Sequence, residues 1–168
     1  RLRTRAREPH AMVTTRREGT RVTLYFAFGS NLDLDQMADR CPGHLVVGYA
    51  ILRDHRLIFR GPSSRRKAGV ASVDPVLGSH VPGILFEIDD AGLAVLDRLE
   101  GHPHWYRRAY VPVVGADGDL NEALIYRLPG DVEVMAPTDD YLNQIRGAYA
   151  HHGLPRGFDP GILEAGLL

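Results

Sequence analysis

An uncharged apolar run that stops abruptly at Gly-Ser-Asn is the feature that most constrains the fold of this 168-residue chain. Residues 24–28, Leu-Tyr-Phe-Ala-Phe, suit a strand that is buried on both faces. Gly29 has no Cβ, so it can adopt positive φ angles and lets a ligand approach the backbone closely. The run predicts a strand that delivers a small-residue loop to a ligand, although an ordinary strand-turn-helix connection fits these residues equally well.

A helix should begin directly after this loop. Asp33 is a suitable N-cap and Gln36 stands where it would complete a capping box, which places the helix start near Leu34. The amides of residues 29–32 would then lie outside the helix, beside its positive dipole end, where an anion or a developing oxyanion is stabilised. The segment lacks both the GxGxxG and the P-loop patterns, so a dinucleotide or P-loop site is not indicated.

The later elements do not alternate regularly between strand and helix. Strands are expected over residues 45–59 (one bent strand or two), 68–73, 81–88, 106–114 and 121–128. Helices are expected over residues 34–41, from a cap at 89–90 to Gly101, and from a cap at 138–140 to Gly153. About six or seven strands with three helices predict an α+β fold, in which a curved mixed sheet or small β-barrel is flanked by the helices.

Apolar residues recur at helical spacing in the last two predicted helices. Leu93, Leu96 and Leu99 follow this spacing in the second helix, and Leu142, Ile145 and Tyr149 lie on one face of the third.

Charge is distributed unevenly along the chain. The net charge is −1, but residues 1–23 hold seven arginines against two glutamates, so residues 24–168 are acidic. We expect a basic, flexible arm over residues 1–21 and a single domain over residues 22–168. Arginines bind phosphates without sequence preference, but the arm has no aromatic residues to stack on bases, so nucleic-acid binding is the weaker interpretation.

The cysteine, histidine and hydropathy patterns bear on the cellular location, on membrane association and on metal binding. Cys41 is the only cysteine, which favours a cytoplasmic location and a structural thiol. No apolar stretch is long enough to span a bilayer, and the start has no secretory signal pattern, so no membrane association is expected. The histidines at 102, 104, 151 and 152 lack further ligands at a convincing spacing, so no metal is expected.

A second informative stretch is Leu-Asp-Arg-Leu-Glu-Gly at residues 96–101. Glu100 falls on the last helical turn, where partial negative charge disfavours an exposed carboxylate by about 0.3–1 kcal/mol. The same field, and burial in a pocket, would raise the pKa of Glu100 and suit it to general acid/base catalysis. On this stretch alone, a surface carboxylate paired with Arg98, Arg107 or Arg108 is the favoured interpretation.

Together, the two stretches resemble the γ-glutamylcyclotransferase, or AIG2-like, family. The family pattern is a strand ending in Tyr-Gly-Ser-Asn-Leu and, further on, a helix ending in Leu-Asp-x-x-Glu-Gly. Residues 28–32 and 96–101 match it, and the resemblance extends from residue 24 to residue 154. One departure is Phe28, where the family usually has Tyr, so a hydroxyl beside the loop is missing.

The resemblance implies an enzyme, of transferase or lyase type, that releases 5-oxoproline from a γ-glutamyl amide or dipeptide. The α-amine of the substrate attacks its own γ-carbonyl and expels an amine, with Glu100 as the general acid/base. Because the attack is intramolecular, no protein nucleophile, metal or cofactor is needed. Residues implied to bind the substrate are Phe28, Gly29, Ser30, Asn31, Leu32, Tyr106, Tyr126 and Tyr141. The tyrosines could equally be core residues.

An alternative from another class is a non-catalytic module that binds a γ-glutamyl-type ligand, and the presence of Glu100 argues against it. The expected partner is a small-molecule γ-glutamyl substrate, and the chain could form a homodimer. The leaving amine cannot be read from the sequence, because the loops expected to select it, 61–67 and 129–137, show no readable preference.

Overall fold

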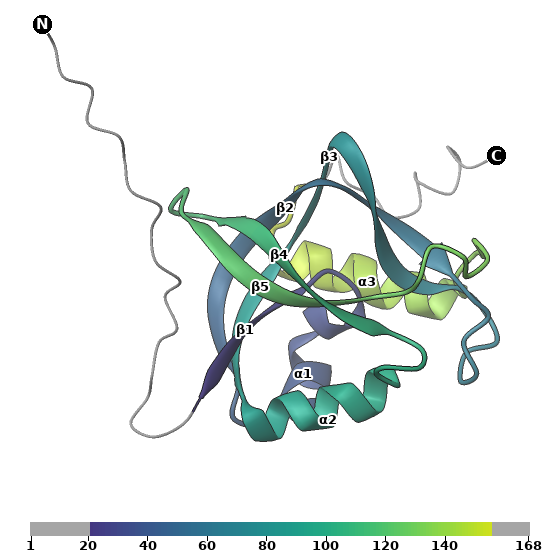
Figure 1. Cartoon of the computed structure of the whole chain (residues 1–168), viewed down its shortest axis with the longest axis horizontal. Helices are drawn as coiled ribbons and strands as arrows, with labels where there is room; N and C mark the ends of the chain where they lie inside the picture. The colour runs from purple at the N-terminus through teal and green to yellow at the C-terminus, as the bar shows by residue number, and fades with distance from the viewer. Residues whose placement is uncertain (1–20, 156–168) are drawn as a thin grey trace, which may run out of the picture.

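A five-stranded closed barrel flanked by helices forms the part of the chain, residues 21–155, that the computed structural model describes (Figure 1). The basic arm predicted over residues 1–21 lies outside it, apart from Arg21. The strands are β1 (Val22–Ala27), β2 (Leu45–Arg60), β3 (Val70–Asp89), β4 (Arg107–Gly115) and β5 (Leu120–Arg127). The helices are α1 (Leu34–Arg40), α2 (Asp90–Glu100) and α3 (Asp139–His151), with a 3₁₀ turn, η1, at Ser30–Leu32. The predicted α+β barrel is confirmed.

β1 closes the barrel, whose strand order is β1-β3-β2-β4-β5. It pairs antiparallel with β3 along its whole length and parallel with β5 where Tyr25 faces Leu124. β1 is apolar because it lies between β3 and β5 in the barrel wall. Phe26 of β1 is fully buried, as are Phe86 of β3 and Leu124 of β5. The loop after β1 therefore starts from a position inside the fold.

The long hairpin of β2 and β3 differs from the prediction. Residues 68–73 and 81–88 were expected as separate strands, but β3 runs unbroken through Pro75 and Pro82, so the barrel has fewer strands than predicted. A proline removes only one ladder donor, and pairing with β2 continues on either side of it. Two register shifts in β2, between Val46 and Gly48 and between Arg53 and His55, bend this hairpin, which rises at the top of Figure 1.

α2 ends where its sequence predicts. Asp89 caps its start by accepting a hydrogen bond from the amide of Gly92, and Gly101 ends it in the left-handed conformation with φ 66°. Leu93 and Leu96 are buried, whereas Leu99, which shares their helical spacing, is 51% exposed. Leu93 and Leu96 thus form a narrow apolar stripe on the helix, and its last turn brings Glu100 to the loop that follows β1.

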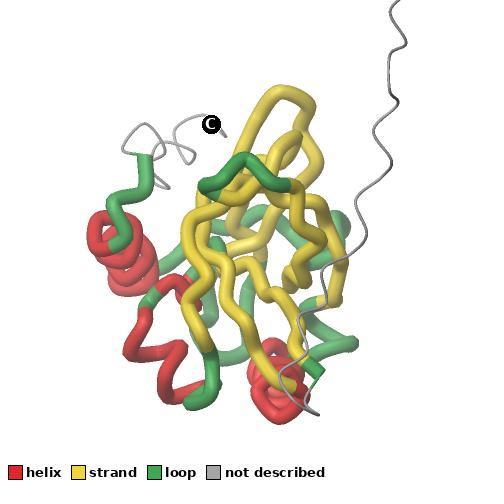
Figure 2. Tube along the Cα trace, turned by 90° about the vertical axis from the view of Figure 1, so that its left-hand side faces the viewer, coloured by secondary structure: helices red, strands yellow, loops and turns green. Residues whose placement is uncertain are grey.

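α3 packs along the outside of the barrel, and Figure 2 shows all three helices outside the strands. Thr138 accepts a hydrogen bond from the amide of Tyr141, and the predicted face of Leu142, Ile145 and Tyr149 is buried. No helix within residues 21–155 is both long and apolar enough to cross a membrane.

Cys41 lies buried between α1 and α2, where its thiol donates a hydrogen bond to the Gly92 carbonyl at 3.4 Å. Burial, with a smaller contribution from Asp89, raises the pKa of the Cys41 thiol to about 11. A thiol in that state is a poor nucleophile, in agreement with the structural role expected of it.

Candidate active site

The loop after β1 forms the tight turn η1. The amide of Leu32 donates to the Gly29 carbonyl at 3.0 Å, and that of Asp33 donates to the Ser30 carbonyl at 3.1 Å. Within the described residues, no hydrogen bond uses the amides of Ser30 and Asn31. Two adjacent backbone donors are thus available beside the pocket, whereas the amide of Leu32 is not.

The start of α1 braces this loop through side chains. Asp33 accepts hydrogen bonds from the amides of Asp35 and Gln36 at 3.1 and 3.2 Å, as an N-cap should. Gln36 does not complete a capping box, which corrects the prediction. Its side-chain amide instead reaches back beyond Asp33 into the loop, donating to the Ser30 hydroxyl at 3.1 Å and to the Asn31 side-chain carbonyl at 3.0 Å. Since α1 has only seven residues, these contacts define the loop more than a helix dipole does.

Gly29 is required for close packing rather than for a positive φ. Its φ is −113°, so it does not adopt the left-handed conformation that a glycine permits. A Cβ at this position would lie 3.0 Å from the Ala71 Cβ and 3.6 Å from the Tyr141 hydroxyl. The loop therefore approaches the Ala71 side chain of β3 more closely than a residue with a Cβ would comfortably allow.

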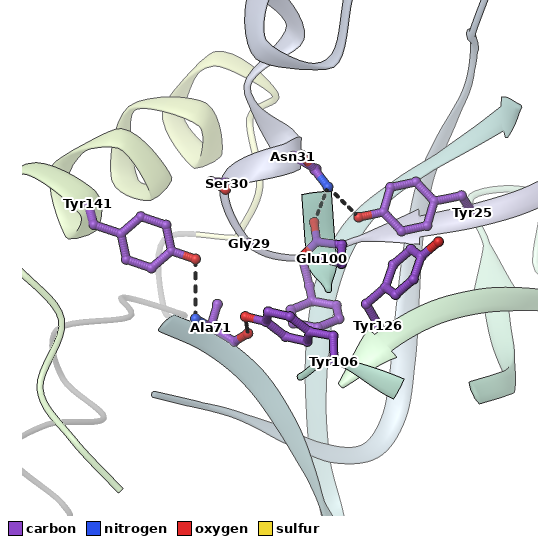
Figure 3. Close-up of a pocket in the computed structure, with 10 residues that line it drawn as sticks. Tyr25, Gly29, Ser30, Asn31, Ala71, Glu100, Tyr106, Tyr126 and Tyr141 are labelled. Atoms are coloured by element: carbon purple, nitrogen blue, oxygen red, sulfur yellow. Dashed lines mark hydrogen bonds between the residues drawn. The ribbon is translucent and has the colours of Figure 1, made fainter. Parts of the chain in front are cut away.

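Asn31 is the centre of the polar network in the pocket. Its side-chain amide donates to the Tyr25 hydroxyl at 2.8 Å and to Glu100 Oε1 at 3.2 Å (Figure 3). Its side-chain carbonyl accepts from Gln36 and from Arg40, the latter at 2.6 Å. All of the hydrogen-bonding atoms of this buried side chain are therefore engaged, which fixes its orientation.

Glu100 points from the end of α2 toward this loop, and its side chain is only 15% exposed. Burial raises the pKa of its carboxyl, while the charge of Arg40 and the hydrogen bond from Asn31 act in the opposite direction without cancelling the rise. Arg40 Nη1 lies 3.5 Å from Glu100 Oε1. The alternative of a surface carboxylate paired with Arg98, Arg107 or Arg108 is wrong, because the cation at Glu100 comes from α1.

Four tyrosines surround the carboxylate, one of which, Tyr25, sequence reasoning missed. Tyr106 donates to the Ala71 carbonyl at 2.6 Å, and the Ala71 amide donates to the Tyr141 hydroxyl at 3.2 Å. Burial raises the pKa of each of these phenols. They are neutral at physiological pH, so they can orient a substrate by hydrogen bonding without adding charge.

Tyr126 is held differently from the other tyrosines. Its hydroxyl donates to Asp97 Oδ1 at 2.8 Å, and the same carboxylate accepts two hydrogen bonds from Arg108. Burial pushes the pKa of Asp97 upward, but the hydrogen bonds from Arg108 and Tyr126 outweigh it and lower the pKa. Asp97, in the Leu-Asp-x-x-Glu-Gly stretch, therefore connects α2 to β4 and β5 beside Glu100.

The pocket brings together most of the residues expected to bind the substrate. It is lined by Tyr25, Phe28, Gly29, Ser30, Asn31, Ala71, Glu100, Tyr106, Tyr126 and Tyr141. Leu32 is the exception, since it is fully buried and does not line the pocket. Tyr25 had a usable signal, because a buried phenol in an apolar strand needs a hydrogen-bond partner. Arg40 and Ala71 had none, because their positions depend on how the barrel closes.

No metal centre is apparent in the described part of the chain, where no group of three or more His, Cys, Asp or Glu side chains is placed to hold an ion. His152 instead contacts the Leu32 carbonyl through Nε2 at 2.7 Å. His102 packs edge-on against Tyr126, with ring centroids 6.4 Å apart.

Comparison with known proteins defines the class of enzyme to which this fold and pocket belong. Residues 25–144 match the family described as gamma-glutamyl cyclotransferase, AIG2-like. The chain belongs to this family and is an enzyme of the cyclotransferase type.

Individual relatives agree with this assignment. The chain is 28% identical over 137 residues to a gamma-glutamylcyclotransferase of Bos taurus, covering 79% of this chain and 72% of the bovine protein. A solved gamma-glutamyl cyclotransferase structure superposes with a TM-score of 0.75 at 27% identity, covering 80% of this chain and 82% of the other. An uncharacterized protein of Homo sapiens superposes with a TM-score of 0.76 at 26% identity, covering 82% and 84%.

Proposed function

We propose that this chain releases 5-oxoproline from a γ-glutamyl amide or dipeptide, with Glu100 as the general acid/base. The observation that carries the proposal is the contact between a buried carboxylate of raised pKa and the loop at residues 29–31, in a pocket with no other carboxylate. A raised pKa makes this carboxyl group a better proton acceptor than an ordinary glutamate, and it can return the proton later in the reaction.

The loop supplies the glutamyl-binding half of the pocket. The amides of Ser30 and Asn31 would donate hydrogen bonds to the carboxylate of the glutamyl group. The wall of tyrosines would fold the glutamyl chain so that its amine approaches its own γ-carbonyl. Because binding already holds the two reacting groups together, the attack itself loses little further entropy, and its barrier is lowered.

The proton then moves in two steps. Glu100 accepts a proton from the α-ammonium group, and the freed amine forms a C–N bond to the γ-carbon. Glu100 returns that proton to the nitrogen of the leaving amine as the original amide C–N bond breaks. The ring nitrogen, which still carries two hydrogens after the attack, gives up one of them, and this second proton leaves with the amine as an ammonium group. The products are 5-oxoproline and an amine, without consumption of water, and no protein nucleophile takes part.

The proposal is tested by incubating the purified chain with γ-glutamyl-alanine in H₂¹⁸O. Mass spectrometry should detect 5-oxoproline without ¹⁸O, together with an equal amount of alanine. Formation of ¹⁸O-labelled glutamate would show hydrolysis instead. Binding without turnover of any γ-glutamyl compound would support the alternative of a non-catalytic module and would contradict the proposal.

A further inference from the structure

Two loops, residues 61–69 and 129–137, are hydrogen-bonded to each other, and the first of them contacts Tyr141 of the pocket wall through Arg66. The Gly61 amide donates to the Glu133 carbonyl and the Gly69 amide to the Ala136 carbonyl, each at 2.9 Å. Gly69 packs so tightly that a Cβ there would overlap the Met135 carbonyl oxygen. The chain segment between Gly61 and Gly69 is therefore anchored at both ends.

A turn within this segment presents three consecutive cationic residues, Arg65, Arg66 and Lys67. The buried Ser63 organises it: its hydroxyl accepts from the Arg66 amide at 3.0 Å, and its carbonyl accepts from the Lys67 amide at 2.9 Å. The backbone that carries Arg66 is thus held in place before any ligand binds.

Arg66 leans over the pocket wall rather than into solvent. Its guanidinium carbon lies 4.1 Å from the centre of the Tyr141 ring, and the hydroxyl of that tyrosine stands beside Gly29 and Ala71. The charge of Arg66 opposes the rise in pKa that burial causes at Tyr141, and also at Tyr106. Its field therefore reaches the phenols that line the pocket.

Arg66 has no carboxylate partner in the part of the chain that the structure describes. The ion pairs there are Arg40–Glu100, Arg60–Asp74 and Arg108–Asp97. A cation–π contact with a tyrosine uses the flat face of a guanidinium group. The N–H donors at its edge stay available for hydrogen bonds. A half-buried cation with available donors, stacked on a tyrosine that lines the pocket, is suited to an anionic group of the ligand.

We propose that Arg66 selects the leaving half of the substrate by binding a free carboxylate on it. This inference rests on the proposed function. The glutamyl half would occupy the inner pocket between residues 29–31 and Glu100, so the part that extends past Tyr141 is the amine that will leave. γ-Glutamyl amino acids and peptides carry a carboxylate there, whereas simple γ-glutamylamines do not.

A matched pair of substrates tests this directly: γ-glutamyl-alanine and γ-glutamyl-alanine amide, which differ only in that the carboxylate is replaced by a carboxamide. A charge-assisted pair with Arg66 should give the acid a kcat/KM roughly 10- to 100-fold above that of the amide. In Arg66→Gln this ratio should fall close to one, mainly through KM, and Arg66→Lys should restore part of it. Arg65→Gln removes the same charge one residue away and should keep the wild-type ratio.

The results separate this inference from the proposed function. A wild-type ratio near one, or a ratio that Arg66→Gln leaves unchanged, would overturn the role of Arg66 while 5-oxoproline release still stood. A uniform loss on both substrates in a folded Arg66→Gln variant would also overturn it, because Arg66 would then serve the shared glutamyl half. Absence of 5-oxoproline from both substrates with the wild-type chain would overturn the proposed function and this inference together.

Discussion

Asn31 and Glu100 are 69 positions apart in the sequence, yet the side-chain amide of Asn31 donates a hydrogen bond to the Glu100 carboxylate at 3.2 Å. Each comes from a short motif that is weak when taken singly. The contact exists because β1 lies in the barrel wall and α2 ends beside it. The loop and the carboxylate consequently form one site whose geometry can be tested residue by residue.

Asn31→Ala should lower kcat more than it raises KM, because it removes the group that orients Glu100. Losing a hydrogen bond to a charged group costs about 1.5–3 kcal/mol, equivalent to roughly 10- to 100-fold in rate if it is expressed in the transition state. Steady-state kinetics on γ-glutamyl-alanine would measure this. Asn143→Ala, at an exposed position on α3, is the matched control and should behave as the wild type.

Arg40→Met should move the acidic limb of the pH–rate profile to higher pH. Glu100 must be ionised to accept the proton, and the charge of Arg40 lowers its pKa. Removing that charge lets the pKa rise further, so activity is lost at a higher pH as the solution is acidified. The profile of kcat/KM measures the shift, with Arg127→Met on β5 as the exposed control. An acidic limb that did not move would contradict this electrostatic role.

Glu100→Gln should gain stability relative to the wild type as the pH rises. The folded chain holds the Glu100 proton to a higher pH than the unfolded chain, so the wild type loses stability as the pH increases through that interval. Gln does not titrate. Thermal unfolding at about pH 4, below the ordinary pKa of a glutamate, and at pH 8 measures the difference, at about 2–4 °C per kcal/mol for a domain of this size. A difference in Tm that is independent of pH would argue against the raised pKa.

Asp97→Asn should destabilise the fold by about 1–3 kcal/mol at pH 7, since Asp97 accepts hydrogen bonds from Arg108 and Tyr126. The folded-state pKa of Asp97 is lowered, so its contribution is present above the unfolded-state pKa and is lost as the pH falls through the folded-state pKa. The gap between variant and wild type in urea unfolding should therefore close at acidic pH. Asp39→Asn, an exposed change, should have little effect at either pH.

Gly29→Ala should lower activity because its Cβ would press on the Ala71 Cβ, only 3.0 Å away, and displace one wall of the pocket. The double variant Gly29→Ala/Ala71→Gly removes the contact and should recover part of the loss, despite the roughly 0.5–1 kcal/mol that a glycine costs in a strand. Activities of the two single variants and the double variant form a cycle. Purely additive losses would show that the close packing is not the cause.

Features that depend on neighbouring residues in the chain, such as helix caps and short motifs, could be predicted from the sequence. Asp33 and Gly101 mark helix ends through capping, and the two motif stretches identify the loop and Glu100. Arg40 could not be predicted as the partner of Glu100, because their approach depends on barrel closure. Similarly, the unbroken course of β3 through Pro75 is decided by its pairing with β2, which outweighs the local turn preference.

Glu100→Gln bears most directly on the central claim. The variant keeps the size of the side chain and one oxygen that can accept the hydrogen bond from Asn31, but it cannot accept the substrate proton. With γ-glutamyl-alanine as substrate, we expect 5-oxoproline release to fall at least about 10³-fold, near the range of 10²–10⁴ for general acid/base catalysis. Glu122→Gln, an exposed carboxylate on β5, should keep wild-type activity. Release of 5-oxoproline at the wild-type rate by folded Glu100→Gln would contradict the account.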